Sequence, residues 1–373
     1  MGKSFAGSGS ENSYSYSYSY SYSLLNFVKA SKSMSKGKSK RELTRRFMSP
    51  KYFLGFDGGG THLRGCLIDE NGDVLAVAAH PPASFPKLRE KIGEPVAALA
   101  SELQSRAGLS NATIVAAGFC STGVGRPADR EIAERALNQK KIAQKIIAES
   151  DALAALTGAF GGGPGIIVIA GTGVICFGRA PNGEIIRAGG WGFLLGDEGS
   201  GFAVAQAALI AALKDWDGRG PKTTLRPVFE NHFNVAGIDL IISQIYSPDF
   251  DRGKFAELAP LVFDAAEQSD EVAKGIIRNT GRAHGHLIRA AVKRGHWQTP
   301  VPLALIGNLF RRRDVLLPGL WEVLPEKDFY VMAPRFEPVI GAALLAMMAA
   351  GAALNEEFLG KLERSWQVKM KHV

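Results

Sequence analysis

Apolar and polar positions in residues 52–79 fall into three short apolar runs separated by turn residues. The predicted strands are 52–56, 63–68 and 74–79. Asn71-Gly72 separates the second run from the third, and Asn-Gly between apolar runs is a strong hairpin signal. The pattern therefore predicts a three-stranded unit, with a glycine-rich turn after its first strand.

The same order of runs returns later in the chain. Strands are predicted at 166–170, 174–178 and 185–186. Thr61 and Asn71 of the first unit correspond to Thr172 and Asn182 of the second, each 111 residues further on. One supersecondary unit thus occurs twice, once at the front of each half of the chain.

Helix and strand patterns alternate after each of these units. Helices are predicted at 87–107, 128–138, 151–160, 202–216, 255–269 and 271–294, and strands at 113–119, 142–148 and 301–306. A duplicated meander followed by βα units implies an α/β fold in which two domains face each other across a central cleft. A ligand is expected at the facing turns.

The length and charge of the chain limit the number of domains and the classes of partner. The 373 residues suggest two globular domains, and the formal net charge is +8. Residues 1–47 carry nine basic and two acidic side chains, so nearly all of that excess lies there. The remainder is close to neutral and lacks the basic field that binding to a phosphate backbone requires, so no nucleic-acid partner is expected.

Residues 1–47 are predicted to be a disordered, low-complexity extension. Ser and Tyr alternate from residue 13 to residue 23, and a run rich in Ser, Lys and Arg follows. Such a segment cannot bury enough apolar surface to order itself. Met48-Ser49-Pro50 stands directly before the first predicted strand, so we interpret the segment as an upstream extension and assign it no function.

Membrane and metal signals are weak. No run reaches the roughly 18 apolar residues of a transmembrane helix, so no membrane partner is expected. Cys66, Cys120 and Cys176 are far apart in apolar runs and fit buried thiols in a reducing compartment, which favours a cytoplasmic location. His284 and His286 are two residues apart and would not share a helix face, so we interpret them as ordinary helix histidines.

Two Gly-Thr turns suggest a nucleotide. A glycine-rich turn leaves backbone N–H groups open to a phosphate, and threonine adds a hydroxyl donor. The repeat is asymmetric, because Asp57 corresponds to Val168. A single carboxylate beside a phosphate loop suits Mg²⁺ held mainly through water and phosphate oxygens. Taken singly, each turn fits an ordinary hairpin and Asp57 a turn residue.

Three segments resemble a known family. They are Asp57 to Thr61 (DGGGT), Gly171 to Gly173 (GTG) and Gly189 to Gly201 (GGWGFLLGDEGSG). They look like the N-acetylglucosamine and glucosamine kinases of the BadF/BadG/BcrA/BcrD ATPase type, in the actin, Hsp70 and sugar kinase superfamily. The resemblance runs from about residue 52 to about residue 350 and implies two ribonuclease H-like domains.

By resemblance, the phosphates of ATP would be held by two turns and the adenosine by a Gly-Asn pair. These residues are Gly58, Gly59, Gly60, Thr61, Gly171, Thr172, Gly173, Gly307 and Asn308. Asp57 would help to place Mg²⁺, and Asp151 would be the catalytic base. Positioning and charge stabilisation are most of what phosphoryl transfer needs. Asp151 also fits a helix N-cap, because Ser150-Asp151 precede a predicted helix.

The resemblance also implies a sugar pocket made by Gly189, Gly190, Trp191 and Asp197. Two glycines permit close backbone approach, an indole offers an apolar face to a pyranose, and a carboxylate accepts hydroxyl hydrogen bonds. The alternative is a glycine-rich loop in which Asp197 and Glu198 cap the next helix. Some relatives carry Asn in the loop after the first meander, whereas residues 81–86 here contain none, which leaves the choice of hexosamine open.

The resulting hypothesis is an ATP- and Mg²⁺-dependent kinase that phosphorylates the 6-hydroxyl of N-acetylglucosamine or glucosamine, with a homodimer left open. The alternatives are an ATPase activator of a dehydratase and a sugar-sensing regulator on a kinase scaffold. The expected division is 1–47 as an extension, 50–150 with 339–353 as the first domain, 151–338 as the second, and 354–373 as a helical extension.

Overall fold

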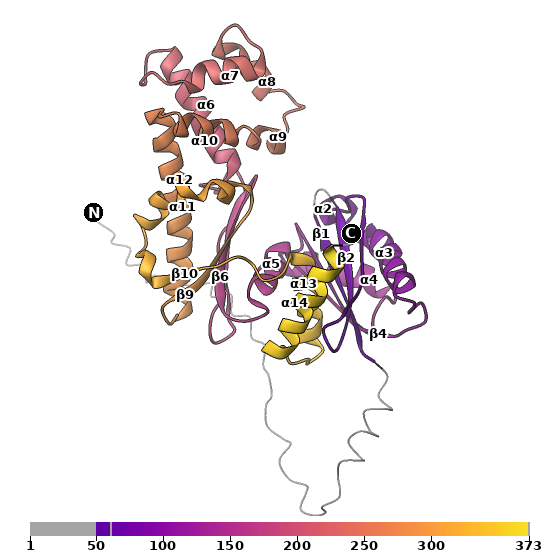
Figure 1. Ribbon diagram of the computed structural model, residues 1–373. Coiled ribbons are helices and arrows are strands. Elements are labelled where there is room, and N and C mark those ends of the chain that lie inside the picture. The colour runs from indigo at the N-terminus through magenta and orange to yellow at the C-terminus, as the bar shows by residue number, and fades with distance from the viewer. Residues whose placement is uncertain (1–49, 60–61, 372–373) are drawn as a thin grey trace, which may run out of the picture. The chain divides into compact units, whose positions relative to one another are not determined.

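The computed structural model describes residues 50–59 and 62–371, and its strands form two five-stranded sheets. The first sheet has the order β3-β2-β1-β4-β5 (Figure 1). Its strands are β1 Tyr52–Gly58, β2 Leu63–Asp69, β3 Val74–His80, β4 Ile114–Ser121 and β5 Lys145–Glu149. The first three strands pair antiparallel, and β4 and β5 join parallel to β1.

The second sheet repeats this arrangement, with the order β8-β7-β6-β9-β10. Its strands are β6 Gly165–Ala170, β7 Val174–Arg179, β8 Ile185–Gly189, β9 Val301–Ile306 and β10 Phe329–Val331. The antiparallel unit again comes first, and β9 and β10 are parallel to β6. The duplicated α/β fold predicted from the sequence repeat is confirmed.

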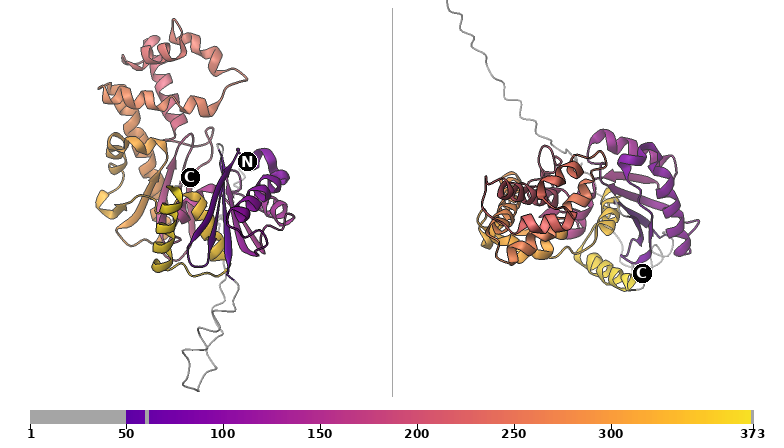
Figure 2. Two further views of the ribbon diagram at one scale, coloured as in Figure 1. Left: turned by 45° about the vertical axis from the view of Figure 1, so that its right-hand side comes forward. Right: turned by 90° about the horizontal axis from the view of Figure 1, so that it is seen from above.

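Helices cover both faces of the first sheet. The helices of this part of the chain are α2 Phe85–Leu88, the 3₁₀ helix η1 Arg89–Ile92, α3 Gly93–Arg106 and α4 Pro127–Asn138. Figure 2 shows α3 and α4 on one side and the C-terminal helices α13 Pro338–Ala349 and α14 Glu356–Met370 on the other. The apolar face of β1 packs on α13, so a C-terminal segment completes the core of the first sheet.

The helix α5 Asp151–Phe160 covers the second sheet and packs against α13. Glycines bring the two helices together: a Cβ on Gly341 would overlap the backbone of Ala154, and one on Gly158 would lie 2.9 Å from the carbonyl oxygen of Phe336. Gly118 of β4 approaches the backbone of Ala342 in the same way. Backbone this close leaves no room for a methyl group, so glycine is required here.

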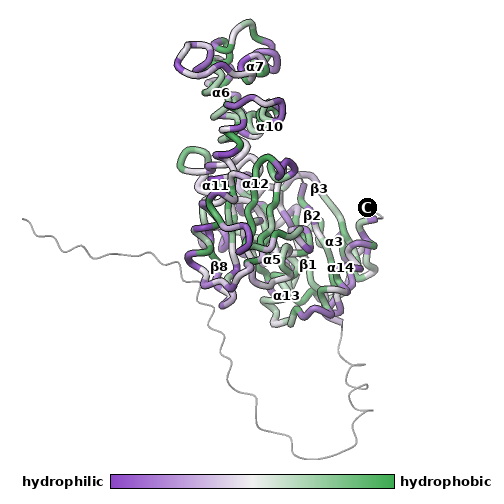
Figure 3. The backbone as a smooth tube through the Cα atoms, turned by 60° about the vertical axis from the view of Figure 1, so that its left-hand side comes forward, coloured by the Kyte–Doolittle hydropathy of each residue, from purple (hydrophilic) through white to green (hydrophobic). Residues whose placement is uncertain are grey.

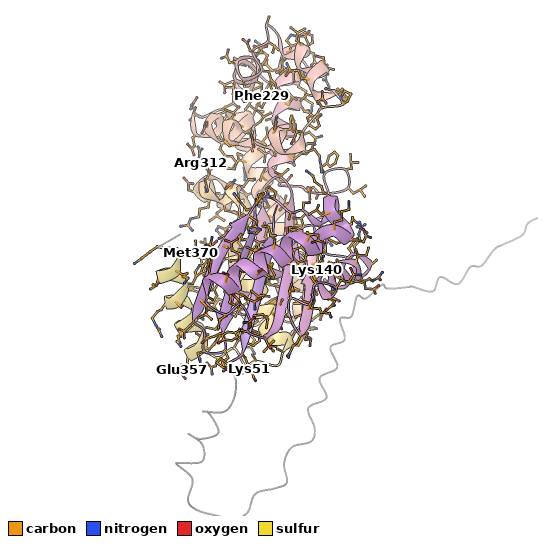
Figure 4. The ribbon with its side chains drawn as sticks, turned by 90° about the vertical axis from the view of Figure 1, so that its right-hand side faces the viewer. Lys51, Lys140, Phe229, Arg312, Glu357 and Met370 are labelled. Carbon is orange, nitrogen blue, oxygen red and sulfur yellow. The ribbon has the colours of Figure 1, made fainter. Side chains whose placement is uncertain are left out.

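The rest of the second half is mostly helical. The helices are α6 Gly201–Trp216, α7 Leu225–Phe233, η2 Ile238–Ile241, α8 Ile242–Ile245, α9 Arg252–Ala256, α10 Ala259–Glu267, α11 Glu271–Gly295, η3 Asn308–Arg312, α12 Arg313–Trp321 and η4 Glu326–Asp328. Phe229 of α7, labelled in Figure 4, is fully buried in this cluster. Buried apolar positions alternate with charged ones along α11, as the hydropathy colouring of Figure 3 illustrates.

Three predicted elements differ from the structure. The helix predicted at 87–107 is interrupted, because Arg89 has a φ of 47° and η1 follows. The helix predicted at 255–269 is two helices, with a turn at 257–258 between α9 and α10. Pro260 has no N–H, so it cannot continue the hydrogen-bond ladder from α9. The strand predicted at 142–148 begins only at Lys145, after a turn in which Lys141 has a φ of 52°.

Among residues 50–59 and 62–371, no helix combines the length and the apolar character needed to cross a bilayer. The described residues belong to one compact unit, and the predicted extension at 1–47 lies outside them. The division into domains at residues 150 and 338 stays a prediction. The predicted C-terminal helical segment corresponds to α14, which packs on β3 through Leu362 and Trp366.

Candidate functional site

Polar side chains gather at the carboxyl ends of three neighbouring parallel strands in the first sheet. The register places Asp57 of β1 beside Cys120 of β4, and Cys120 beside Glu149 at the end of β5. Thr122 therefore follows the middle strand directly, and Asp151 lies two residues beyond the third. The carboxyl ends of parallel strands are where α/β sheets bind their ligands.

The Asp151 carboxylate is held by two local hydrogen bonds. Its Oδ2 accepts from the hydroxyl of Thr122 at 2.6 Å, and its Oδ1 accepts from the amide of Ala152 at 2.8 Å. The N-cap of α5 is Ser150, whose side chain accepts from the amide of Leu153 at 3.2 Å. The capping role considered for Asp151 thus belongs to Ser150, and Asp151 is the first helical residue.

Thr122 is a site residue that our sequence reasoning did not identify. It is exposed and joins Asp151 from a loop 29 residues earlier in the chain. The neighbouring Ser121 is fully buried and donates to the carbonyl of Gly58 at 2.8 Å, which ties β4 to the first glycine turn. A polar Ser-Thr pair at the end of an otherwise apolar strand was the available signal.

Asp57 is a half-buried carboxylate in an acidic setting. Its pKa is raised to about 6, first by burial and then by the negative charge of Asp151, while Arg64 acts in the opposite direction. Arg64 is itself paired with Glu337 in front of α13, which limits its attraction for Asp57. An added positive charge near Asp57 would relieve this unfavourable setting.

The first predicted phosphate turn is described only in part, because Gly60 and Thr61 lie outside the described residues. The amide of Gly59 donates to the carbonyl of His62 at 3.1 Å. A Cβ on Gly58 would lie 2.9 Å from the hydroxyl of Ser121, so the backbone here approaches β4 closely.

The second predicted turn, Gly171 to Gly173, begins directly after β6. The amide of Gly171 donates to the carbonyl of Gly173 at 2.9 Å, and the amide of Gly201 donates to the carbonyl of Gly171 at 2.8 Å. The amide of Phe202 reaches the carbonyl of Thr172 at 3.4 Å. The turn is therefore braced by the first residues of α6, and the Thr172 side chain is exposed.

Asp197 lies against this turn. Its Oδ1 accepts from the amide of Val174 at 3.4 Å, and a Cβ on Gly173 would lie 3.0 Å from its Oδ2. Burial raises the pKa of the Asp197 carboxyl, against hydrogen bonds from Val174 and Gly192. The N-cap of α6 is Ser200, whose hydroxyl accepts from the amide of Ala203 at 3.1 Å. Asp197 is thus not the helix cap.

Gly189 is the last residue of β8, and Gly190 and Trp191 follow it on the loop that carries Asp197. Both glycines have a φ of 71°, a conformation that other residues rarely adopt. Trp191 is 65% exposed, and the guanidinium of Arg187 lies 4.7 Å from the centre of its ring. An apolar face is therefore open to a ligand next to the loop that carries Asp197.

Gly307 and Asn308 follow β9, which is parallel to β6. Ile169 pairs with Ile306, so the Gly307 backbone lies beside Ala170 and close to the second turn. Gly307 has a φ of 112°, and a Cβ on it would overlap the carbonyl of Ala170. Asn308 begins η3 and is exposed. Two of the predicted nucleotide-binding segments therefore lie at the ends of neighbouring strands.

A pocket of about 460 Å³ opens beside the second turn. Its lining residues are Thr172, Gly173, Phe193, Asp197, Phe202, Phe250, Asp251, Arg252 and Gly253. The pocket brings Thr172 and Gly173 together with Asp197, and the described residues of the first turn are not among its lining residues. A larger surface hollow of about 580 Å³ lies on the exposed face of α4, around Glu131 and Arg135, away from these turns.

Within the described ranges 50–59 and 62–371, no three His, Cys, Asp or Glu side chains cluster in a way that could bind a metal ion. A divalent ion near Asp57 would thus need most of its ligands from water and substrate oxygens, which is how Mg²⁺ is commonly held at phosphate sites.

Comparisons with known proteins identify relatives of this chain. Residues 54–346 match the profile of the BadF/BadG/BcrA/BcrD ATPase family. The N-acetylmuramic acid/N-acetylglucosamine kinase of Clostridium acetobutylicum is 33% identical over 245 residues, covering 65% of this chain and 80% of that kinase. The N-acetyl-D-glucosamine kinase of Dictyostelium discoideum is 30% identical over 323 residues, covering 80% of this chain and 99% of that kinase.

A solved structure agrees with these matches. It is a protein from Chromobacterium violaceum that was provisionally named an N-acetylglucosamine kinase, with a TM-score of 0.64 and 30% identity. The match covers 79% of this chain and 98% of that one.

Proposed function

The chain belongs to the BadF/BadG/BcrA/BcrD ATPase family, and from this premise we propose that it is an ATP-dependent kinase that phosphorylates the 6-hydroxyl of N-acetylglucosamine or glucosamine. The names of the relatives from Clostridium acetobutylicum and Dictyostelium discoideum support an amino-sugar acceptor. A structural relative at 30% identity carries a name of the same kind.

The observation that carries the proposal is the fixed carboxylate of Asp151 at the end of the first sheet. Each of its oxygens accepts one hydrogen bond, from Thr122 or from Ala152, and keeps a further lone pair. In the proposed reaction Asp151 accepts the proton of the sugar 6-hydroxyl as that oxygen attacks the terminal phosphorus of ATP, the bond from that phosphorus to the bridging oxygen breaks, and ADP leaves. A positioned base of this kind contributes about 10²- to 10⁴-fold to rate.

Asp57 fits the role of the Mg²⁺ carboxylate. It is a half-buried acid close to a second acid, Asp151, so a divalent cation would offset the repulsion that raises its pKa to about 6. Mg²⁺, when bound, would neutralise the charge that develops on the phosphate oxygens during transfer. Asp57 would hold it together with water and phosphate oxygens.

The second turn and its neighbours supply the nucleotide side. Amides and the exposed hydroxyl of Thr172 are suited to phosphate oxygens, and Gly307-Asn308 at the end of β9 would receive the adenosine. On the acceptor side, the exposed ring of Trp191 offers a face for the pyranose, and Asp197 offers acceptors for its hydroxyls. These assignments of ligands to residues are part of the proposal.

The alternative of a dehydratase activator is not favoured. Such activators hold an iron–sulfur cluster on a pair of cysteines, and this chain has three, Cys66, Cys120 and Cys176, all buried. They lie on β2, β4 and β7 inside apolar surroundings, and burial raises the pKa of each thiol, so that none is readily available as a thiolate ligand.

The test is a coupled ADP-release assay with purified protein, ATP and Mg²⁺. Glucosamine, N-acetylglucosamine, N-acetylmuramic acid, glucose and N-acetylmannosamine are compared as acceptors, and the product is identified by mass and by the position of its phosphate. We expect transfer to the 6-hydroxyl of at least one glucosamine derivative, well above the rate with glucose. Sugar-independent ATP hydrolysis with no sugar phosphate would contradict the proposal.

A further inference from the structure

Arg252 occupies the rim of the pocket beside the second turn. It is the first residue of α9, and the pocket that it lines also includes Thr172 and Gly173. Its guanidinium lies 4.5 Å from the centre of the Phe193 ring. The side chain is exposed, so it rests on an aromatic face at the mouth of the pocket instead of filling the core.

The charge of Arg252 is not committed to an ion pair in the part of the chain that the structure describes. The neighbouring Asp251 is used elsewhere, since its Oδ1 accepts from the amides of Gly253 at 2.7 Å and Lys254 at 3.0 Å. Arg312, by contrast, is paired with both Asp264 and Glu267. Arg252 therefore has donors available for a ligand.

The lining of the pocket has one basic side chain and two acidic ones, Asp197 and Asp251. A polyphosphate brought to the Thr172-Gly173 turn would meet amide donors on one side and repulsion from these carboxylates on the other. A guanidinium is the group that offsets this repulsion best, because its planar fork donates two parallel hydrogen bonds to phosphate oxygens.

We propose that Arg252 is a phosphate-binding residue for the nucleoside triphosphate held at the Thr172-Gly173 turn. The guanidinium lies over the Phe193 ring, and from there it would donate to oxygens of the terminal phosphates. The inference rests on the proposed function for the identity of the nucleotide, and it adds a side chain to a turn that otherwise offers amides and one hydroxyl.

Arg252 stacked on Phe193 also fits a second role, as a clasp between the loop 189–200 and α9. The two roles differ in what they require from the side chain. A clasp needs a long stem packed on the ring, whereas a phosphate ligand needs the charge and its forked donors. The variants Arg252→Met, which keeps a long apolar stem, and Arg252→Lys, which keeps the charge, separate them.

The experiment measures binding of AMP, ADP and a non-hydrolysable ATP analogue to the full chain by calorimetry with Mg²⁺. For Arg252→Ala and Arg252→Met we expect affinity for the ATP analogue to fall about 10- to 100-fold, the loss of a charge-assisted hydrogen-bond pair. Affinity for AMP should stay within about twofold, and Arg252→Lys should recover part of the loss.

Lys254→Ala is the matched control, because it removes the same charge from the same short helix without touching the pocket lining. We expect it to bind the ATP analogue within about twofold of wild type. An equal loss of affinity for the ATP analogue in Lys254→Ala would show that the effect comes from the net positive charge of this region and not from a contact made by Arg252, and would overturn the proposal. Wild-type affinity in Arg252→Met would overturn it in favour of the clasp.

Kinetics with the sugar acceptor add a second readout. A higher KM for the sugar with unchanged nucleotide affinity would place Arg252 on the acceptor side and overturn the proposal. If wild type transfers phosphate to no hexosamine but still binds the triphosphate in a way that depends on Arg252, the proposed function fails and the assignment of Arg252 stands.

Discussion

The hydroxyl of Thr122 lies 2.6 Å from Oδ2 of Asp151 and donates a hydrogen bond to it. The two residues follow neighbouring parallel strands, β4 and β5, so the sheet itself sets their separation. With the amide of Ala152 on the other oxygen, the carboxylate is held from two sides and its orientation is defined before any substrate arrives.

We predict that Thr122→Val lowers kcat about 10- to 100-fold while the KM for ATP stays close to wild type. The variant keeps the size and branching of the side chain and removes only the hydrogen bond to a charged partner, which is worth about 1.5–3 kcal/mol. Steady-state kinetics with the best sugar acceptor measure the effect.

Thr122→Ser is the matched control, because it keeps the hydroxyl and should retain most of the activity. Thr122 is exposed, so the melting temperature of both variants should stay near that of wild type. Wild-type kcat in Thr122→Val, or equal losses in Val and Ser, would show that the hydrogen bond does not position the base.

We predict that Asp151→Asn lowers turnover by about 10²- to 10⁴-fold, the usual contribution of a general base. Asn keeps the shape of the side chain and its oxygen can still accept from the amide of Ala152, so the variant should fold and nucleotide affinity should be unchanged. Single-turnover phosphorylation and calorimetry measure the two properties separately.

Asp217→Asn serves as the control for Asp151→Asn, since Asp217 is an acid whose ion pair is with its near neighbour Arg219. It should turn over at the wild-type rate. An Asp151→Asn variant with near wild-type turnover would refute the assignment of the base.

We predict that Asp57→Asn stabilises the folded protein at pH 8 in the absence of Mg²⁺ and abolishes Mg²⁺-dependent transfer. Burial and the charge of Asp151 raise the pKa of Asp57 from 3.8 to about 6, so the folded state binds this proton more tightly than the unfolded state. Stability from this group therefore falls as pH rises from about 4 to 6 and stays low above that. Removing the charge should recover about 1–3 kcal/mol.

Urea unfolding at pH 8 and at pH 4 tests whether Asp57→Asn raises the free energy of unfolding as predicted. The gain of Asp57→Asn over wild type should be present at pH 8 and close to zero at pH 4, where the wild-type carboxyl is protonated in the folded state. A variant that is less stable than wild type at pH 8 would contradict the electrostatic account.

The duplicated strand pattern could be predicted from the sequence because its signals are local. Period-two runs and Asn-Gly turns do not depend on distant residues, and the second copy repeats the first at a constant offset. The strand pairing places Asp57 one residue before the end of β1, where β6 has Ile169 instead of the Val168 expected from the constant offset. The counterpart is apolar in either case, so the asymmetry of the repeat remains.

The contacts that complete the site depend on the tertiary structure. Thr122 meets Asp151 only because β4 lies between β1 and β5, an order that no local pattern encodes. The approach of Asp197 to Gly173 likewise needs the loop 189–200 to fold back onto the turn after β6. The predicted helix 87–107 is interrupted at Arg89, which has a positive φ. Nothing in this residue type indicates a helix end.

His284 shows a further contact of this kind, between α11 and the end of the glycine-rich loop. The ring is fully buried, and its Nε2 lies 2.7 Å from the carbonyl oxygen of Gly199, to which it donates when neutral. The sequence suggested an ordinary helix histidine, and nothing local connected it to Gly199. The bond holds the loop two residues from Asp197.

We predict that the free energy of unfolding of His284→Gln falls less steeply with decreasing pH than that of the wild-type protein. Burial lowers the pKa of His284 from 6.5 to about 4, so the unfolded state takes up this proton first as the pH falls. The free energy of unfolding therefore carries no penalty from His284 above about pH 6.5. Between about pH 6.5 and pH 4 this group lowers the free energy of unfolding by about 3 kcal/mol. Gln can still donate to the Gly199 carbonyl but does not titrate. His286→Gln is the control, because His286 is exposed on the same helix, and it should follow the wild-type curve. Urea unfolding between pH 4 and 7 gives the slope of the free energy of unfolding against pH for each protein. Equal slopes for His284→Gln and wild type would refute the prediction.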